Sequence, residues 1–302
     1  MSKNILITGG SGMIGMQLST LLAGKGYQIA HLTRKKNAAH LYRQFEWDVD
    51  SDYLEDGALA FADIIIHLAG AGVADKRWTA DRKQLIIDSR TETAGLLYRK
   101  LRANEELSID KFISASAIGY YGMYTGDTLL HEDHQAGDDF LAEVVVKWEA
   151  AADQFNEFGI PVSKLRVGVV LAKEGGALPQ LAMPIKFGVG AALGSGKQMM
   201  SWIHIDDICA MFLKLVEEDH IGVFNGVAPE PVSNRMMTKS VAKVLAKPLW
   251  LPNVPGFVMK LMLGEMAGIV LGGNNVSSEK LQKSAYQYKY ASIKHALEGI
   301  YK

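Results

Sequence analysis

The segment ILITGGSGMIG, which runs from Ile5 to Gly15, constrains the fold more than any other part of the chain. Its first three residues form a continuous apolar run, which is typical of a strand buried on both faces of a parallel sheet. A helix is predicted from Met13 to Ala23, and a second strand from Tyr27 to Thr33. Between the first strand and the helix, three glycines follow the spacing G-x-x-G-x-x-G: Gly9, Gly12 and Gly15. This order predicts an α/β fold with a doubly wound parallel sheet.

The three glycines have separate physical roles in a dinucleotide site. One permits the sharp turn from strand to helix, one lets the backbone approach a pyrophosphate, and one lets the helix pack closely on the strand. The helix directs its first N–H groups and the positive end of its dipole at phosphates. A glycine-rich turn without a ligand is the alternative, but the strand, helix and second strand favour the dinucleotide. The predicted cofactor contacts of this segment are Thr8, Gly9, Gly12, Met13, Ile14 and Gly15.

The end of the second strand indicates which dinucleotide binds. Sites specific for NAD usually place an acidic residue there, which accepts from the ribose 2′-hydroxyl. This chain has Thr33 followed by Arg34, and a guanidinium favours the 2′-phosphate of NADP. A solvated basic turn is the alternative. A third strand, predicted from Phe45, ends at Asp48, whose carboxylate is placed either to accept from the adenine amino group or to cap the following turn.

The segment ADIIIHLAG, from Ala62 to Gly70, is the clearest buried strand of the sequence, and it ends in small residues. Small side chains let the backbone pass close to a cofactor at the carboxyl end of a strand. Leu68, Ala69 and Gly70 are therefore predicted cofactor contacts. Ser89 lies in the helix predicted from Thr79 to Leu101 and is a further candidate, although a solvated helix face explains it equally well.

Hydroxyl groups gather in the next predicted strand, FISASAIGYYG, from Phe112 to Gly122. A strand with a purely structural role would carry aliphatic residues there. Hydroxyls that follow a parallel strand lie in the crevice where ligands bind. The candidate catalytic residues are Ser116, Tyr120 and Tyr121.

Glycine and proline content divides the chain after Leu171. Residues 172–200 are rich in both and are predicted to form a loop-rich excursion, while prolines, methionines and helical periodicity dominate after Pro229. We therefore expect an NADP-binding Rossmann domain made of residues 1–171 and 201–226. Residues 172–200 and 227–302 would form a smaller, α-rich C-terminal lobe that contacts the substrate.

Composition excludes several other classes of protein. The 302 residues carry a formal net charge of −1, so no global field favours nucleic acid or an anionic membrane. The single cysteine, Cys209, excludes an internal disulfide and favours a cytoplasmic location. Residues 256–273 are long and apolar, but charges and glycines interrupt them, which favours a core or interface helix over a membrane span. We expect a small-molecule substrate and leave a homodimer open.

His204, Asp206 and Asp207 lie together in the segment SWIHIDD. Neighbouring residues of a strand alternate between its faces, so these three side chains are not expected to point in one direction. We therefore predict no metal site and expect a structural role, or a substrate contact near the mouth of the cleft.

The order of these motifs resembles the extended short-chain dehydrogenase/reductase superfamily: TGGSGMIG, HLAG, SASAIGYYG and SWIHIDD. More closely, the chain is similar to an atypical branch of nucleoside-diphosphate-sugar epimerase-like proteins whose substrate is unknown. The motifs specific to that branch are RW at 77–78, DSR at 88–90, FLAEVVVKWE at 140–149, GSGKQMMSWIHIDD, FNGVAPEPVSN from Phe224 and LGE at 263–265. The resemblance covers essentially the whole chain. It implies a doubly wound sheet, a smaller C-terminal substrate lobe, and NADP binding through Gly9, Gly12, Gly15 and Arg34.

The catalytic pair of that superfamily is missing. Its members use a tyrosine and a lysine one helical turn apart, together with a serine from the preceding strand end. Aligned on Glu149, these two positions hold Leu141 and Val145, and neither side chain exchanges a proton. Lys147 is no simple substitute, because two residues along a helix rotate a side chain by about 200°. Ser116 does occupy the serine position.

Two functions remain open. In the first, the protein is an NADP-dependent oxidoreductase or epimerase that acts on a small polar substrate, nucleotide-linked sugars included. Ser116 would then orient a substrate oxygen, and Tyr120 or Tyr121 would replace the missing acid/base. In the second, the protein binds NADP without catalysis and signals through a partner. The hydroxyl-rich strand end favours the first, and the lost pair favours the second.

Overall fold

The predicted parallel strands form one eight-stranded sheet in the computed structural model, which describes residues 3–104 and 106–302. Its strand order is β12-β8-β6-β5-β1-β2-β3-β4, and every neighbouring pair is parallel except β3 with β4. The strands are β1 (Asn4–Thr8), β2 (Gln28–Thr33), β3 (Arg43–Asp48), β4 (Tyr53–Leu54), β5 (Ile64–His67), β6 (Lys111–Ala117), β8 (Val162–Val167) and β12 (Gly222–Gly226). The predicted doubly wound α/β fold is therefore confirmed.

The strand order reverses at β1, which lies in the centre of the sheet. The chain runs outward through β2 and β3 on one side, then returns to place β5 on the other side of β1. Ile5, Leu6 and Ile7 are fully buried, as are Ile64, Ile65 and Ile66 of β5. In open sheets of this kind, ligands bind outside the carboxyl ends of the strands at the reversal point.

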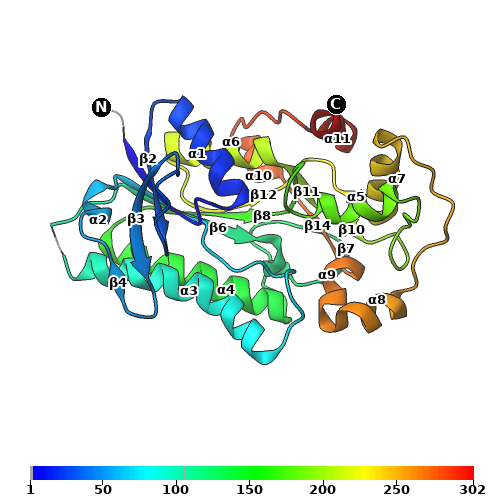
Figure 1. Cartoon of the computed structure of the whole chain (residues 1–302), viewed down its shortest axis with the longest axis horizontal. Helices are drawn as coiled ribbons and strands as arrows, with labels where there is room; N and C mark the ends of the chain where they lie inside the picture. Colours follow the sequence, from blue (N-terminus) through cyan, green and yellow to red (C-terminus); the bar gives the residue numbers. More distant parts are fainter. Residues whose placement is uncertain (1–2, 105) are drawn as a thin grey trace.

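Helices cover both faces of the sheet, so that the molecule has three layers in its larger part (Figure 1). On one face, α1 (Met13–Gly24) packs against α6 (Ile205–Glu217). On the other face lie α2 (Ala58–Phe61), α3 (Ala80–Arg102) and α4 (Phe140–Asp153), with α3 and α4 in contact. Their buried side chains explain why the strands read as continuous apolar runs.

Two predicted elements are shorter than expected. The strand predicted to reach Gly122 ends at Ala117, and the 3₁₀ turn η1 (Ile118–Tyr121) follows it. The sequence from Phe140 to Phe158 predicts one helix, but α4 ends at Asp153 and the 3₁₀ turn η2 (Gln154–Phe158) follows it. The sequence VSKLRVGVVL predicts one strand from Val162 to Leu171, but Gly168 divides it into β8 and β9 (Val169–Leu171).

The segment at 172–200, predicted to be rich in loops, also contains a helix. It contains α5 (Leu178–Lys186), whose buried residues Leu178, Ala182 and Ile185 repeat at helical spacing. Pro179 fits because the first turn of a helix does not need its missing N–H. Proline content alone therefore predicted the wrong state for these nine residues.

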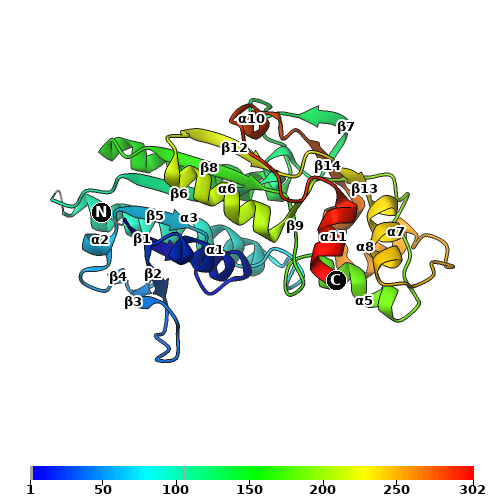
Figure 2. The same cartoon turned by 90° about the horizontal axis from the view of Figure 1, so that it is seen from above.

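Much of the chain after β12 extends the molecule along its longest axis, beyond the end of the large sheet, while α10 (Glu279–Lys283) packs beside β12; this part is the predicted C-terminal lobe (Figures 1 and 2). Its other helices are α7 (Asn234–Val244), α8 (Gly256–Leu263), α9 (Ala267–Leu271) and α11 (Ile293–Tyr301), with the 3₁₀ turn η3 (Gly264–Met266). Three small sheets pair β7 (Tyr124–Leu130) with β14 (Gly273–Val276), β10 (Met199–Met200) with β13 (Val232–Ser233), and β9 with β11 (Trp202–His204).

The pairing of β7 with β14 joins a segment from the first half of the chain to the C-terminal lobe. The domain boundaries at residues 171, 200 and 226 stay a prediction.

The apolar segment at 256–273 is broken into three short elements. Gly264 has a φ of +61°, which ends α8 and separates it from η3. Within the described residues, the chain has no helix with the length and apolar character that crossing a membrane requires. No residue of α8 is buried, and Met262 is 64% exposed, so the core interpretation of this helix is wrong.

Candidate functional site

The glycine-rich turn is packed too tightly to accept side chains. Gly9 has a φ of +67°, and a Cβ there would lie 2.8 Å from the carbonyl carbon of Leu68. A Cβ on Gly15 would lie 2.5 Å from the carbonyl oxygen of Gly9. These contacts hold the turn against the end of β5 and the start of α1, as the roles of the first and third glycines require.

The N-terminus of α1 lacks the side-chain cap that most other helices of nine or more residues have, α5 being the second without one. Its N-cap residue is Gly12, which offers no side-chain acceptor, whereas side chains cap α3, α4, α6, α7 and α11. Among the described residues, no group outside the helix accepts a hydrogen bond from the N–H of Met13 or Ile14. Bare N–H groups at the positive end of a helix dipole form an anion site. The pyrophosphate of a dinucleotide fits this position.

The end of β5 is tied to β1 and to α3 by hydroxyls. Thr8 Oγ1 accepts from the backbone N–H groups of Leu68, at 3.1 Å, and Ala69, at 3.0 Å. Ser89 Oγ accepts from the N–H of Ala71 at 2.9 Å. Three predicted cofactor contacts, Thr8, Leu68 and Ala69, therefore meet at the reversal point of the sheet, and Ser89 fixes the loop beside them.

The turn after β2 carries a free cation. Arg34 is exposed and makes no hydrogen bond or ion pair with any described residue. Thr33 Oγ1 accepts from the N–H of Lys35 and donates to its carbonyl, which shapes the turn that presents Arg34. Asp48 accepts from the N–H of Asp50 at 3.1 Å and from Ser51 Oγ at 2.7 Å. Asp48 therefore caps its own turn, and its contact with adenine stays a prediction.

A chain of hydrogen bonds links the glycine-rich turn to the loop after β2. Ser19 Oγ donates to the carbonyl of Gly15 at 2.7 Å, so it accepts from Nε2 of His31, also at 2.7 Å. Nδ1 of His31 then accepts from Nε2 of His40 at 2.8 Å. Burial, and next the charge of His40, lower the pKa of His31 to about 4. A Cβ on Gly10 would lie 2.5 Å from Nδ1 of His31, so this ring packs directly against the backbone of the glycine-rich turn.

Ser116 is bonded to a buried ion pair. Its Oγ donates to Glu149 Oε1 at 2.5 Å. Arg166 donates to the same carboxylate from Nε, at 2.8 Å to Oε1, and from Nη2, at 3.0 Å to Oε2. Burial works to lower the pKa of Arg166, but the hydrogen bonds and charge of Glu149 outweigh it, so this pKa is raised. Since the Ser116 proton is donated to Glu149, its oxygen is left as an acceptor.

The two candidate tyrosines have different surroundings. Tyr121 is buried, and its hydroxyl donates to Asn225 Oδ1 at 2.7 Å and accepts from Arg166 Nη1 at 3.1 Å. Burial raises the pKa of Tyr121, and the charge of Arg166 opposes that rise. The ring of Tyr120 lies over the Arg166 guanidinium, and its hydroxyl makes no hydrogen bond with a described residue. Only Tyr120 therefore has a proton that is not already donated.

The positions of the absent catalytic pair are filled by apolar packing. A Cβ on Gly119 of η1 would lie 3.4 Å from Leu141 Cβ and 3.7 Å from Val145 Cγ2. The 3₁₀ turn thus rests on the helix face where the superfamily carries its tyrosine and lysine. This packing explains why both positions are aliphatic.

His204 and Asp207 make capping and packing contacts inside the fold. His204 Nδ1 accepts from the N–H of Asp206 at 3.0 Å, which caps α6, and its ring packs on Tyr290. Asp207 is buried and accepts from the N–H groups of Lys289 and Tyr290. Over the part of the chain that the structure describes, no group of three or more His, Cys, Asp or Glu is placed to hold a metal ion.

The buried Glu149–Arg166 pair was not predicted as part of the site. Arg166 was the available signal, since a guanidinium in a strand between buried parallel strands requires a buried acidic partner. Glu149 is on α4, 17 residues earlier, and no local pattern relates the two positions.

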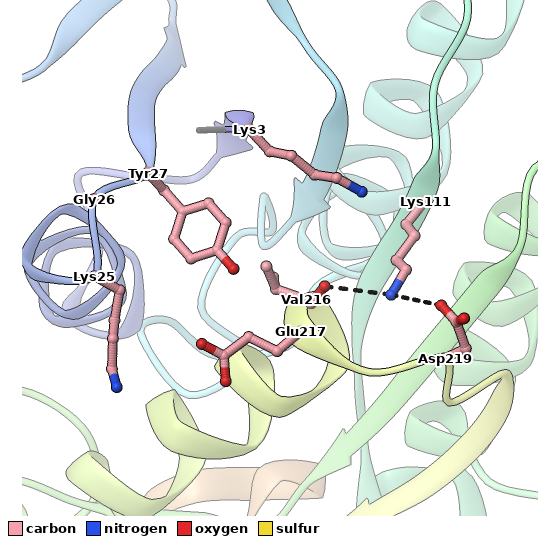
Figure 3. Close-up of a pocket in the computed structure, with 8 residues that line it drawn as sticks. All are labelled: Lys3, Lys25, Gly26, Tyr27, Lys111, Val216, Glu217 and Asp219. Atoms are coloured by element: carbon pink, nitrogen blue, oxygen red, sulfur yellow. Dashed lines mark hydrogen bonds and ion pairs between the residues drawn. The ribbon is translucent and has the colours of Figure 1, made fainter. Parts of the chain in front are cut away.

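Two hollows lie outside the dinucleotide crevice. One, of about 730 Å³, is lined by Trp78, Phe140 and Glu265, among others, and the Lys83–Glu265 ion pair of 2.6 Å joins α3 to η3 beside it. The other, of about 580 Å³, opens at the amino ends of β2 and β6, the wrong edge of the sheet for a dinucleotide (Figure 3).

Figure 3 shows why the second hollow is a poor anion site. Lys111 is bonded to the Val216 carbonyl, at 3.3 Å, and to Asp219, at 3.0 Å. Lys3 is paired with Asp110 at 3.0 Å. Two of the three lysines in the lining are therefore neutralised, and only Lys25 is left. Glu217 adds a negative charge, so the net positive field in this hollow is weak.

Comparison with known proteins identifies the family of the chain. A family model described as "NAD dependent epimerase/dehydratase family" matches residues 5–225, and a model described as a domain of unknown function (DUF1731) matches residues 254–300. Epimerase family protein SSP1921 of Staphylococcus saprophyticus is 37% identical over 303 residues, which cover 99% of both chains.

Three solved structures illustrate the similarity, which extends over essentially the whole chain. The human epimerase family protein SDR39U1 (isoform 2), solved with NADPH, has a TM-score of 0.86 and 28% identity, covering 98% of each chain. A nucleoside-diphosphate sugar epimerase from Corynebacterium glutamicum has a TM-score of 0.80 and 29% identity, covering all of this chain and 59% of that one. UDP-glucose 4-epimerase from Thermotoga maritima, at 16% identity and a TM-score of 0.78, shares the fold.

Proposed function

The chain belongs to the NAD dependent epimerase/dehydratase family, and from this premise we propose that it is an NADP(H)-dependent oxidoreductase or epimerase-like enzyme. Its substrate would be a small polar molecule, with nucleotide-linked sugars among the candidates. The observation that carries the proposal is the N-terminus of α1, where bare N–H groups behind a glycine-rich turn face the reversal point of the sheet.

NADP, rather than NAD, is the proposed cofactor. Arg34 has no partner among the described residues and follows the strand end where the 2′-substituent of the adenosine ribose lies. A guanidinium binds a phosphate with two parallel hydrogen bonds, which a 2′-hydroxyl cannot accept in the same way. The human relative of similar fold was solved with NADPH, which supports the same choice.

The proposed chemistry divides between two residues of this chain. A bound nicotinamide would supply or accept the hydride. Ser116, with its proton donated to Glu149, would accept a hydrogen bond from a substrate hydroxyl and orient it. Tyr120, whose hydroxyl has no partner among the described residues, would donate or accept the proton, and Tyr121 is the second candidate for that role.

One observation favours the second function, an NADP-binding protein without catalysis. Leu141 and Val145 occupy the positions of the superfamily's tyrosine and lysine and are packed against η1. In this alternative the buried Ser116–Glu149–Arg166 cluster stabilises the fold, and the bound cofactor changes the protein's stability or its affinity for a partner.

An activity screen separates the two functions. The purified protein is held with NADPH and a panel of carbonyl and sugar-nucleotide substrates, while absorbance follows oxidation and product analysis follows epimerisation. In Ser116→Ala and Tyr120→Phe we expect rates to fall at least about a hundredfold with NADPH affinity unchanged. Tyr53→Phe, on the exposed strand β4, is the matched control.

Activity that survives both substitutions would refute this assignment of the site, and Tyr121→Phe would then be tested next. No turnover with any substrate, combined with tight NADPH binding, would favour the protein without catalysis.

We further propose a cytoplasmic location and a substrate lobe made of residues 172–200 and 227–302. The buried thiol of Cys209 supports the location, because the chain carries no other cysteine with which to form an internal disulfide. A homodimer is proposed through the exposed apolar residues of α8, Phe257, Leu261 and Met262, and light scattering measures it directly.

A further inference from the structure

Two arginines of α3, Arg82 and Arg90, lie under the loop that follows β5. Arg90 is 9% exposed, and its guanidinium lies over the Trp148 ring, 4.9 Å from the ring centre. Nη1 donates to the carbonyl of Ile86 at 2.8 Å and lies 3.4 Å from Ser89 Oγ. Nε is buried without a hydrogen-bond partner. Within residues 3–104 and 106–302, no carboxylate forms an ion pair with Arg90.

Arg82 also has a guanidinium N–H that lacks a hydrogen-bond acceptor. Its Nη2 donates to the Gly72 carbonyl at 2.5 Å and lies 3.5 Å from the exposed carboxylate of Asp75. Its Nε, like that of Arg90, is buried without a partner. The two side chains project from the same helix, two turns apart, toward the loop at residues 70–75.

Burying these cations together is unfavourable unless an anion joins them. Burial, and next the charge of Arg82, lower the pKa of Arg90 to about 10, so the guanidinium is still charged at neutral pH. A buried charge without a counter-ion destabilises a fold, and most proteins pair it. Glu149 and Arg166, on the next helix and strand, form such a pair, which makes the missing partner of Arg90 distinctive.

The position of Arg90 relates it to the reacting half of the crevice. A Cβ on Gly70 would lie 2.9 Å from the Arg90 Cζ and 3.1 Å from its Nη2, so the guanidinium lies directly behind this glycine. Gly70 follows β5, which neighbours β1 on the side away from β2. The adenosine half of a dinucleotide lies over β2, and the nicotinamide half therefore lies over β5.

We propose that Arg90, assisted by Arg82, forms a subsite for an oxyanion, a carboxylate or a phosphate, carried by the substrate close to its reacting carbon. The Nε and Nη2 atoms of Arg90 are two parallel donors, and they match the two oxygens of such a group. This inference rests on the proposed function, since it assumes that the dinucleotide occupies the crevice. It restricts the substrates to anionic ones.

The test measures anion binding and needs no turnover. Protein saturated with NADPH is titrated with malonate and, separately, with inorganic phosphate, and the melting temperature and nicotinamide fluorescence are followed. We expect saturable binding of one of the two anions, and the better one identifies the class of oxyanion. Arg90→Gln should weaken that binding at least about tenfold, and Arg82→Gln less. Arg99→Gln, an exposed arginine of the same helix, should leave it unchanged.

Three results would overturn the proposal. The first is that the wild type binds neither anion saturably. The second is that Arg99→Gln weakens anion binding as much as Arg90→Gln does. The third is that Arg90→Gln weakens NADPH binding and that NADPH and the anion compete. The last result would assign Arg90 to the cofactor pyrophosphate. If NADPH does not bind at all, the proposed function fails, and the same anion titration of the protein alone still tests the subsite. If Arg90→Gln does not fold, Arg90→Lys replaces it in the titration, because lysine keeps the positive charge but lacks the two parallel N–H donors of the guanidinium.

Discussion

Replacing Glu149 with glutamine should destabilise the protein far more than its small change in shape suggests. The carboxylate accepts three hydrogen bonds, from Ser116 Oγ and from two nitrogens of Arg166. An amide keeps one acceptor, and its NH2 group then faces a donor of Arg166. The guanidinium is left buried and without a counter-charge, since its side chain is only 3% exposed. Removing one partner of such a pair costs about 3–5 kcal/mol.

Urea denaturation of the two proteins measures this difference in the free energy of unfolding. Glu143→Gln is the matched control, because Glu143 lies on the same helix and pairs with Lys147 at 2.6 Å, with both side chains about half exposed. That exposed pair contributes no more than about 0.5 kcal/mol. The double variant Glu149→Gln/Arg166→Met should lose less than the sum of its single variants. A loss below about 1 kcal/mol in Glu149→Gln would refute the reasoning.

Three further predictions concern the histidines, the glycine-rich turn and the C-terminal lobe. Burial lowers the pKa of His31 to about 4 and that of His67 to about 3, so the unfolded chain takes up their protons first on acidification. The free energy of unfolding should therefore be highest above about pH 6.5. Toward pH 4 it should fall by up to about 1.4 kcal/mol per pH unit for each histidine. Urea titrations that give the same free energy of unfolding from about pH 7 to about pH 5 would contradict this prediction. Gly10→Ala should cost about 1–3 kcal/mol because its Cβ overlaps the His31 ring, whereas Gly24→Ala, with open space around it, should be neutral in the same assay. Met262→Glu should weaken the proposed homodimer but change the stability of the monomer by less than about 0.5 kcal/mol, whereas Met266→Glu, at 6% exposure, should cost the monomer several times more. Equal losses in the monomer would contradict the exposed position of Met262.

The large sheet was predictable because its signal is local. Runs such as Ile5–Ile7 and Ile64–Ile66 are buried on both faces, and only a central parallel strand needs that composition. The end of β6 was predicted less well. The segment Ile118–Tyr121 continues the pattern of the strand, but it turns into a 3₁₀ helix that packs on Leu141 and Val145, and that contact joins residues more than 20 positions apart.

The candidate site was predictable where it consists of backbone. Glycine spacing and strand ends predicted the candidate anion site at α1, because each requirement there applies to neighbouring residues. Hydroxyl content identified Ser116, Tyr120 and Tyr121, but it contained no information on how their protons are used. The partners Glu149, Arg166 and Asn225 come from three other elements, and only the folded chain brings them together.

Fluorescence titration with NADPH and NADH tests the central claim most directly, because every function discussed above requires the dinucleotide to occupy the crevice at α1. The account predicts saturable binding of both, with NADPH at least about tenfold tighter, which corresponds to about 1.4 kcal/mol. Arg34→Ala should remove most of that difference and leave NADH binding nearly unchanged, while Arg99→Ala should have no effect. Equal affinities would contradict the role of Arg34, and no saturable binding of either cofactor would contradict the account as a whole.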